Sequence, residues 1–179
     1  MLGQRPATVW LTGLSGAGKS TLAFALERYL IGHGHACYVL DGDNVRHGLN
    51  RDLGFSAKDR SENIRRIAEV AKLINDAGLI VITAFISPFL RDRAMAREII
   101  GPERFIEAHL CAAIGVCETR DSKGLYRKAR AGEIPEFTGI TSPYEAPEHP
   151  AVTIDTERMT VEASVNAIMG PLASRLHRR

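Results

Sequence analysis

The residues with the clearest chemical meaning lie near the start of the chain, in the segment GLSGAGKS at positions 13–20. Its pattern, G-x-x-x-x-G-K-S, is typical of the phosphate-binding loop of nucleotide-using enzymes. Glycines let successive backbone N–H groups turn toward phosphate oxygens, and the positive end of the following helix points to the same place. We expect Lys19 to reach the β- and γ-phosphates of a nucleotide and the Ser20 hydroxyl to bind Mg²⁺. A glycine-rich turn before an ordinary helix is the alternative, but the apolar run 9–11 just before the segment favours nucleotide binding.

A pair of carboxylates, Asp41 and Asp43, follows the next apolar run at 36–40. Carboxylate oxygens suit magnesium coordination and the activation of a hydroxyl group. An aspartate turn that caps a helix is the simpler interpretation of the same residues. Because the chain also carries the phosphate-binding pattern, we favour the functional interpretation. Arg46, on the short helix predicted to follow, is either an anion contact or a solvated surface side chain.

Arg60 stands near the predicted start of a long helix, where the helix dipole disfavours a cation. Its position is easier to explain if it faces a bound anion, because a guanidinium group matches phosphate or sulfate oxygens. Phe55 lies in the polar loop just before this helix. It is either a stacking partner for a base or a core anchor, and composition does not separate the two.

Ser87 lies in the segment FISPF at 85–89, where a third apolar run ends. A serine at this place is a candidate phosphoacceptor or substrate contact. It is also predicted as the N-cap of a helix that Pro88 begins, and the two roles are compatible. No aspartate ends this run, so the usual second acidic motif of phosphate-loop enzymes is missing there. We expect Asp41 or Asp43 to replace it.

The segment 120–147 shows little strand or core-helix character. A basic, flexible segment beside a phosphate site is typical of a lid that closes, expels water and neutralises the transferring phosphate. The alternative is a solvated charged helix with a long loop. A loop of this length without core character is usually functional or disordered. Its first part carries the basic residues Arg120, Lys123, Arg127, Lys128 and Arg130.

Apolar runs alternate with helical patterns along the chain, which predicts an α/β fold with a parallel sheet of about five strands and helices on both faces. We expect strands at 8–11, 36–40, 79–85, 105–112 and 151–154, and helices at 18–33, 44–50, between Ser56 and Gly78, from Pro88 onward and at 160–176. Ligands of such sheets gather at the carboxyl ends of the strands. With no repeat or linker, residues 1–179 are expected to form one domain, with the lid at about 120–147.

The composition, 45% hydrophobic and 25% charged, is that of a globular protein. A net charge of +2 does not suggest nucleic-acid binding. Cys37, Cys111 and Cys117 lack paired spacing, which argues against a disulfide framework or a zinc site. No signal peptide and no apolar stretch of membrane length are recognised, so we expect no membrane partner and a cytoplasmic location. Trp10 is expected in the core.

Together these segments resemble the adenylylsulfate kinase (APS kinase) family of sulfate assimilation. The matching stretches are 10–21, 41–55, 59–66, 85–89, 117–132 and 137–140, so the resemblance covers nearly the whole chain. It implies a three-layer phosphate-loop kinase fold like that of nucleoside monophosphate kinases, with a mobile lid. It also implies transfer of the γ-phosphate of MgATP to the 3′-hydroxyl of adenosine 5′-phosphosulfate (APS), giving PAPS and ADP. A homodimer, and an ATP sulfurylase module as fused or separate partner, are further implications.

The resemblance also assigns site residues. ATP would bind at Gly13, Leu14, Ser15, Gly16, Ala17, Gly18, Lys19, Ser20 and Thr21, with Mg²⁺ at Ser20 and Asp41. The catalytic residues would be Lys19, Asp41 and Ser87, with Asp41 activating the 3′-hydroxyl. APS would contact Asp43, Arg46, Phe55, Arg60, Asn63, Ile86, Ser87, Lys123 and Phe137. Phe55 and Phe137 would enclose the adenine. Ser87 matches a serine that carries phosphate in some members, although direct in-line transfer needs no phosphoenzyme.

Three alternatives remain at this point. A phosphate-loop kinase for a nucleoside or sugar would explain Lys19 and the lid, but not the segments 41–55 and 137–139. A non-catalytic PAPS-binding domain is disfavoured by the intact 18–20 motif and Asp41. The third alternative is a kinase module excised from a fusion with an ATP sulfurylase module. Two departures from the family pattern, Ser122 and Thr141, lie in the predicted lid and bear on its kinetics.

Overall fold

Five parallel strands form one sheet in the order β2-β3-β1-β4-β5 in the computed structural model, which describes residues 3–176 and, at Asp43, the backbone alone. The strands are β1 (Thr8–Thr12), β2 (Cys37–Asp41), β3 (Ile80–Ala84), β4 (Phe105–Cys111) and β5 (Val152–Asp155). The helices are α1 (Lys19–Gly32), α2 (Gly42–His47), α3 (Ala57–Asp76), α4 (Leu90–Ile100), α5 (Ile114–Thr119), α6 (Leu125–Arg130) and α7 (Val161–Leu176). This architecture confirms the predicted α/β fold.

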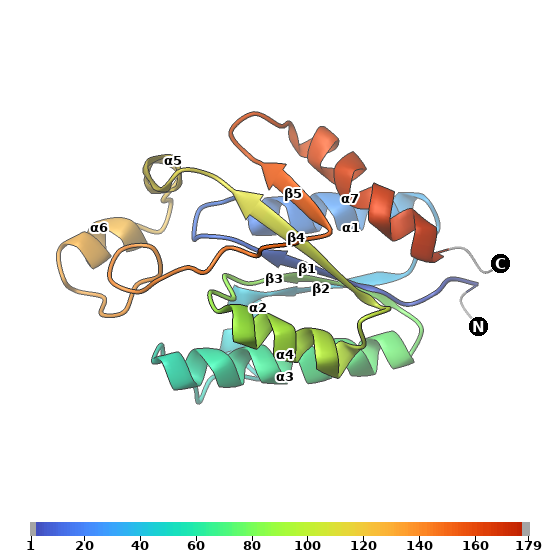
Figure 1. Ribbon diagram of the computed structural model, residues 1–179, viewed down its shortest axis with the longest axis horizontal. Helices are drawn as coiled ribbons and strands as arrows, with labels where there is room; N and C mark the ends of the chain where they lie inside the picture. Colours follow the sequence, from blue (N-terminus) through green and yellow to red (C-terminus); the bar gives the residue numbers. More distant parts are fainter. Residues whose placement is uncertain (1–2, 177–179) are drawn as a thin grey trace.

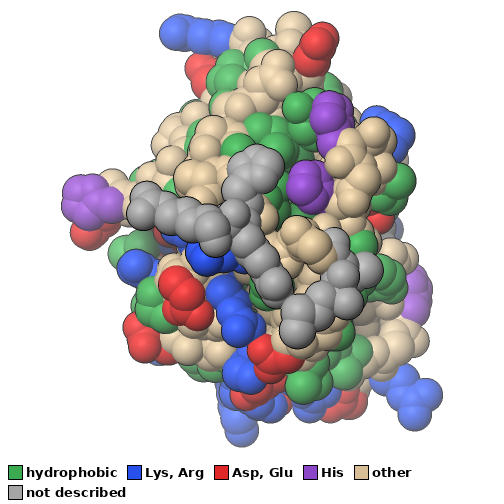
Figure 2. Space-filling model, turned by 90° about the vertical axis from the view of Figure 1, so that its right-hand side faces the viewer, with side chains coloured by type: hydrophobic (Ala, Val, Ile, Leu, Met, Phe, Trp, Pro, Cys, Tyr) green, Lys and Arg blue, Asp and Glu red, His purple; other side chains and the backbone are tan. Residues whose placement is uncertain are grey.

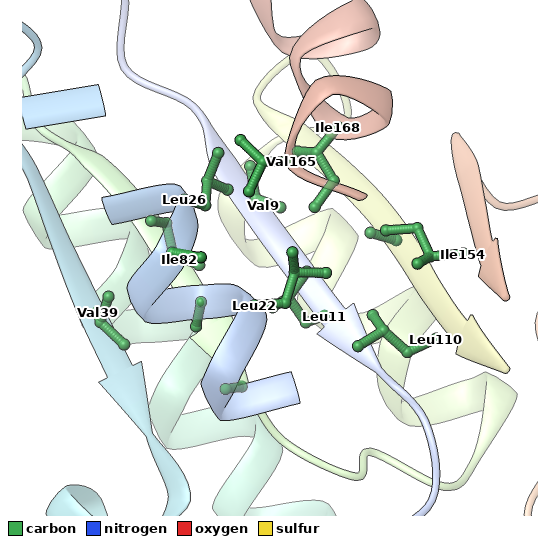
Figure 3. Packing of buried hydrophobic residues seen from close by; sticks show 14 of the residues in the cluster. Val9, Leu11, Leu22, Leu26, Val39, Ile82, Leu110, Ile154, Val165 and Ile168 are labelled. Carbon is green, nitrogen blue, oxygen red and sulfur yellow. The ribbon is translucent and has the colours of Figure 1, made fainter. Parts of the chain in front are cut away.

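Helices cover both faces of the sheet: α1 and α7 lie on one face, and α3 and α4 on the other (Figure 1). β1 is central, and all of its residues are buried, as expected for an apolar strand covered on both sides. Val9 and Leu11 pack among Leu22 and Leu26 of α1, on the side that α7 also covers (Figure 3). Trp10 points the opposite way and belongs to the core under α3 and α4, because side chains alternate along a strand.

The start of α4 differs from the sequence prediction. The helix begins at Leu90 rather than at Pro88, and its N-cap residue is Phe89, so Ser87 is not the cap. Ser87 has a positive φ of 40°, outside the extended region that an N-cap residue usually adopts. The Leu90 N–H instead donates to the carboxylate Oε2 of Glu145 at 2.7 Å, which replaces a side-chain cap from the preceding loop.

The segment 120–147 contributes more to the core than its sequence indicates. It includes the short helix α6, and five of its residues are buried: Tyr126, Ala129, Phe137, Thr138 and Pro147. The prediction of little core character is therefore wrong for these positions. In Figure 1, α5 and α6 lie beyond the carboxyl ends of the strands, apart from the helices that flank the sheet.

The opposite end of the molecule, where the strands begin, carries basic and acidic side chains side by side (Figure 2). Asp76 accepts from both Lys72 and Arg104 there. Charges of both signs thus offset one another at the end remote from α5 and α6. Within residues 3–176, no helix combines the length and the apolar character that crossing a bilayer requires.

Candidate active site

The loop between β1 and α1 is shaped by glycines that tolerate unusual backbone geometry and close contacts. Gly16 and Gly18 have φ values of 76° and 93°, where side chains are strained. A Cβ atom on Gly13 would lie 2.5 Å from the Leu110 carbonyl oxygen, and one on Gly16 would lie 2.7 Å from that of Cys117. Gly18 is the N-cap of α1, so the free N–H groups of the first helical turn face the loop. This is the geometry that an anion-binding loop requires.

Lys19 is buried at the base of this loop. Its Nζ atom donates to the carbonyl oxygens of Gly13 at 2.9 Å and Leu14 at 2.6 Å. Burial lowers the pKa of Lys19 from its ordinary value to about 8, although Cys117 and Asp41 act in the opposite direction. The ammonium is therefore held by neutral acceptors at the place where a polyanion would supply stronger ones.

Ser20 and Asp41 meet across the sheet edge. Ala84 of β3 is in register with both Leu11 of β1 and Asp41 of β2, so the carboxyl ends of these strands are level. The Ser20 hydroxyl donates to Asp41 Oδ2 at 2.6 Å. A hydroxyl and a carboxylate side by side are oxygen donors of the kind that Mg²⁺ prefers. The Asp43 side chain lies outside the part of the chain that the structure describes, so its predicted role is untested.

Ser87 is almost fully enclosed, with 2% of its surface exposed. Its Oγ accepts from Trp10 Nε1 at 3.1 Å and donates to the Phe85 carbonyl at 3.4 Å. The guanidinium of Arg93, itself buried, donates to the Ser87 carbonyl at 2.7 Å and thereby holds the strained backbone. Ile86 beside it is half-buried. The structure thus fixes this turn tightly beside the Thr12 end of β1, whose hydroxyl donates to the Ile86 carbonyl at 2.8 Å.

A second group of predicted site residues lies around the start of α3. The Arg46 guanidinium stacks over the Phe55 ring, 4.2 Å from its centroid. Burial lowers the pKa of Arg46 and of Arg60. Phe55 remains 56% exposed, which rules out the core-anchor interpretation. Asn63 is buried and accepts from Asn50 Nδ2 at 2.9 Å.

Arg60 joins this group to the segment 120–147. Its Nε donates to the Phe55 carbonyl at 2.8 Å, its Nη1 to Thr138 Oγ1 at 2.7 Å and its Nη2 to the Glu136 carbonyl. The residues on either side of Thr138 are Phe137, which is 7% exposed, and Gly139. The guanidinium therefore draws together the two loops that carry the predicted adenine-binding aromatic residues.

The five basic residues predicted for the lid are all exposed: Arg120, Lys123, Arg127, Lys128 and Arg130. Arg120 donates to both oxygens of Thr156, and Arg130 bonds to Glu118. A hollow of about 590 Å³ lies nearby, lined by Leu14, Ile114 and residues 139–144.

Some residues that organise the site were not singled out from the sequence. Arg93 bonds to Ser87, to the Glu145 carbonyl and to the Glu107 carboxylate. Tyr144 stacks on His109, and its hydroxyl lies 3.0 Å from Thr12 Oγ1. No sequence signal distinguishes Arg93 from the exposed arginines of the same helix, because its burial depends on segments distant in the chain.

A parallel sheet with a phosphate-binding loop after its central strand β1, and an acid at the end of β2 with β3 between the two strands, is typical of a phosphate-loop kinase. The family model "Adenylylsulphate kinase" matches residues 5–155, and the chain belongs to this family of enzymes. The adenylyl-sulfate kinase of Staphylococcus epidermidis is 59% identical over 167 residues, which are 93% of this chain and 84% of that protein. That of Geotalea uraniireducens is 60% identical over 167 residues, which are 93% and 80% of the two chains.

A solved structure of the Mycobacterium tuberculosis APS kinase CysC in complex with AMPPNP and APS superposes with a TM-score of 0.91. The two chains are 47% identical, and the match covers 94% of this chain and 98% of the other. The family match at residues 5–155 includes the loop, the strand ends and the segment 120–147.

Proposed function

We propose that this protein transfers the γ-phosphoryl group of ATP to the 3′-hydroxyl of APS, producing PAPS and ADP. The observation that carries the proposal is the presence of two half-sites in one molecule. The phosphate-binding loop with Lys19 and the Ser20–Asp41 pair forms one, and the Arg60-linked loops form the other. The similar M. tuberculosis protein was solved with an ATP analogue and APS together. A second, anionic nucleotide beside ATP would account for the arginines and exposed aromatic ring of the second half.

ATP would bind at residues 13–21, with its β- and γ-phosphates at Lys19. Phosphate oxygens would replace the Gly13 and Leu14 carbonyls as acceptors from Nζ and keep it protonated. APS would bind in the second half, with Phe55 and Phe137 at its adenine. The APS contacts proposed are Asp43, Arg46, Phe55, Arg60, Asn63, Ile86, Ser87, Lys123 and Phe137.

Asp41 is proposed to orient the 3′-hydroxyl and to accept its proton as the oxygen attacks the γ-phosphorus. The bond from that phosphorus to the bridging oxygen breaks at the same time, and ADP leaves. Lys19 and basic side chains of the segment 120–147 stabilise the negative charge of the moving phosphoryl group. Ser20 and Asp41 would hold Mg²⁺, which supplies further neutralisation of phosphate charge when bound.

Ser87 is proposed to support direct transfer as a positioning residue rather than to carry the phosphate. Its hydroxyl is enclosed and already engaged with Trp10 and Phe85. A phosphoryl group on Oγ would have to displace these contacts within a tightly held turn.

The remaining assignments rest on the family resemblance. We propose that residues 1–179 act as one domain with 120–147 as a mobile lid, that the enzyme is cytoplasmic and that it forms a homodimer. An ATP sulfurylase, fused or separate, would supply APS. Neither nucleic acid nor a membrane is proposed as a partner.

The deciding experiment measures ADP formation from MgATP with APS, beside AMP, adenosine and gluconate as alternative acceptors. Mass spectrometry and NMR would locate the new phosphate. We expect turnover with APS alone and phosphate on the 3′-oxygen. Turnover on another acceptor would refute the APS assignment, and tight PAPS binding without turnover would indicate a sensing domain.

A further inference from the structure

Tyr126 occupies a position that none of the predicted roles uses. It lies on the first turn of α6, and only 2% of its surface is exposed. Its hydroxyl donates to the backbone carbonyl of Ser15, at a distance of 2.9 Å and across 111 positions of sequence. Burial raises the pKa of Tyr126, so the phenol stays protonated and remains a donor at every physiological pH. One buried side chain thus connects α6 to the phosphate-binding loop.

The loop side of this connection is held closely. Gly16, next to Ser15, packs so tightly on α5 that a Cβ atom would lie 2.7 Å from the Cys117 carbonyl oxygen. The two carboxylate oxygens of Asp121 accept from the N–H groups of Leu125 and Tyr126, at 2.9 and 2.7 Å, and fix the start of α6. The Tyr126 ring is therefore oriented from both ends. A change in the backbone of residues 15–16 would be felt directly by its hydroxyl.

The other side of the ring faces the proposed APS half. The Tyr126 and Phe137 rings make an edge-to-face contact with centroids 4.9 Å apart and an interplanar angle of 74°. Phe137 precedes Thr138, whose hydroxyl accepts from Arg60 Nη1 at 2.7 Å, and Arg60 Nε donates to the Phe55 carbonyl. A continuous series of contacts therefore runs from Ser15 through Tyr126, Phe137 and Arg60 to Phe55.

We propose that Tyr126 is a positioning residue that couples the two half-sites, so that a nucleotide on the phosphate-binding loop raises the affinity for APS. The inference rests on the proposed function, because it takes residues 13–21 as the ATP half and Phe137 as part of the APS half. When the loop binds phosphates, the Ser15 carbonyl becomes fixed, and the ring that donates to it holds Phe137 in place. Phe137 then loses its conformational entropy before APS binds, so APS binding does not have to order it. This is the thermodynamic basis of positive coupling.

The test measures APS affinity by calorimetry, with and without a saturating non-hydrolysable ATP analogue and Mg²⁺, for the wild type and Tyr126→Phe. This variant keeps the ring and its contact with Phe137 and removes the donor to Ser15. Tyr38→Phe is the matched control, because Tyr38 is an exposed tyrosine on the edge strand β2. Thermal unfolding establishes that each variant is folded.

In the wild type we expect the analogue to tighten APS binding by about 5-fold or more, within the usual range of coupling between sites. Tyr126→Phe should lower this factor toward one, by about threefold or more, as expected for one lost hydrogen bond. Each ligand bound alone should change by less than about twofold, and Tyr38→Phe should match the wild type. By reciprocity, APS must change the affinity for the analogue by the same factor in every protein.

Three results would overturn the inference: an unchanged coupling factor in folded Tyr126→Phe, a wild-type factor of one, or weaker binding of one ligand alone with the factor intact. Absence of APS binding by the wild type itself, under both conditions, would instead mark failure of the proposed function. That outcome is distinct, because it does not depend on the variant.

Discussion

The phosphate-binding loop and the segment 120–147 border the same site, but different forces hold them. The loop lies between the central strand and a helix packed on the sheet, and two of its glycines, Gly13 and Gly16, approach backbone atoms too closely to accept a Cβ atom. The segment 120–147 lies beyond the strand ends. Tyr126, Ala129 and Phe137 pack on the core, and polar contacts such as Arg60 to Thr138 hold its exposed part. The first arrangement can adjust only slightly without disturbing the core, whereas the exposed part of the second can shift by exchanging hydrogen bonds.

The difference is consistent with the two tasks proposed. Phosphates of ATP need a preformed cradle of N–H groups, because orienting such groups during the reaction would be costly. APS must enter and PAPS must leave, and solvent-accessible polar contacts exchange easily with water. Thr141, where the family pattern has aspartate, shows how such a contact works. Its hydroxyl accepts from the Phe137 N–H at 2.9 Å and closes the turn 137–141. The threonine therefore supplies the acceptor that this turn requires.

The largest expected effect tests the loop. Lys19→Ala should lower kcat by at least about 10³-fold, because it removes a buried cation directed at transferring phosphate. The rate of ADP formation at saturating APS would measure this effect. Lys72→Ala, which removes a lysine at the far end of α3 that pairs with Asp76, is the control and should leave the rate unchanged. A Lys19→Ala enzyme with more than about a tenth of the activity would contradict the electrostatic role of the loop.

The second largest expected effect tests the contacts that hold the segment 120–147. Arg60→Ala removes three hydrogen bonds from a charged donor and frees the 136–138 loop from Phe55. We expect the KM for APS to rise about 10- to 100-fold, since bonds of this kind contribute about 1.5–3 kcal/mol. The KM for ATP should rise much less than the KM for APS, because none of the three Arg60 bonds reaches residues 13–21. Equal effects on the two KM values would show that the two regions are not separable in this way.

Arg65→Ala provides the matched control for that measurement. Arg65 lies on the same helix but pairs with Glu62 and Glu69 on its exposed side. Surface pairs of this kind contribute about 0–1 kcal/mol, so neither KM should move appreciably. A rise in the KM for APS in this variant would indicate that general loss of positive charge, rather than the contacts of Arg60, weakens binding.

A smaller effect comes from the protonation of Lys19. With a pKa of about 8 in the folded protein, Lys19 loses its charge as the pH rises through that value. The affinity for an ATP analogue should therefore fall above pH 8, approaching tenfold per pH unit. In Lys19→Arg the cation persists, and the curve should be flat in this range. Measuring the Kd from pH 7 to 10 in both proteins distinguishes the two behaviours.

The same shift has the opposite sign for stability. In the unfolded chain Lys19 keeps its ordinary pKa of 10.5, so between about pH 8 and 10.5 the unfolded state binds more protons than the folded one. The contribution of Lys19 to the free energy of unfolding should therefore rise with pH across this window, while ATP affinity falls. Parallel loss of both quantities would show that another group controls the pH dependence.

The sequence predicted the loop side of the site more completely than the other side, for a physical reason. The contacts of residues 13–20 are local: Lys19 bonds to Gly13 and Leu14, and the glycine spacing alone requires this turn. The parallel sheet and the position of Asp41 at a carboxyl strand end follow from the alternation of apolar runs and helices, whereas the strand order does not. Long-range contacts determine three other features: the bond from Arg60 to Thr138, the burial of Arg93 and the bond from Tyr126 to Ser15. The segments involved lie up to 111 positions apart. No periodicity in one chain specifies such pairings.

The smallest expected effect concerns Ser87, in the turn between β3 and α4. Ser87→Ala removes a hydroxyl that accepts from Trp10 Nε1 and leaves that buried donor unpaired. The free energy of unfolding should fall by about 1–3 kcal/mol. The kcat should change by less than about threefold, because the strained backbone is held by Arg93 through the Ser87 carbonyl rather than through the hydroxyl. Denaturant titration and steady-state kinetics on the same preparation measure both quantities. Complete loss of turnover in a folded variant that still binds APS and ATP would mean that the hydroxyl takes part in the transfer, and that the enclosure of Ser87 opens during the reaction.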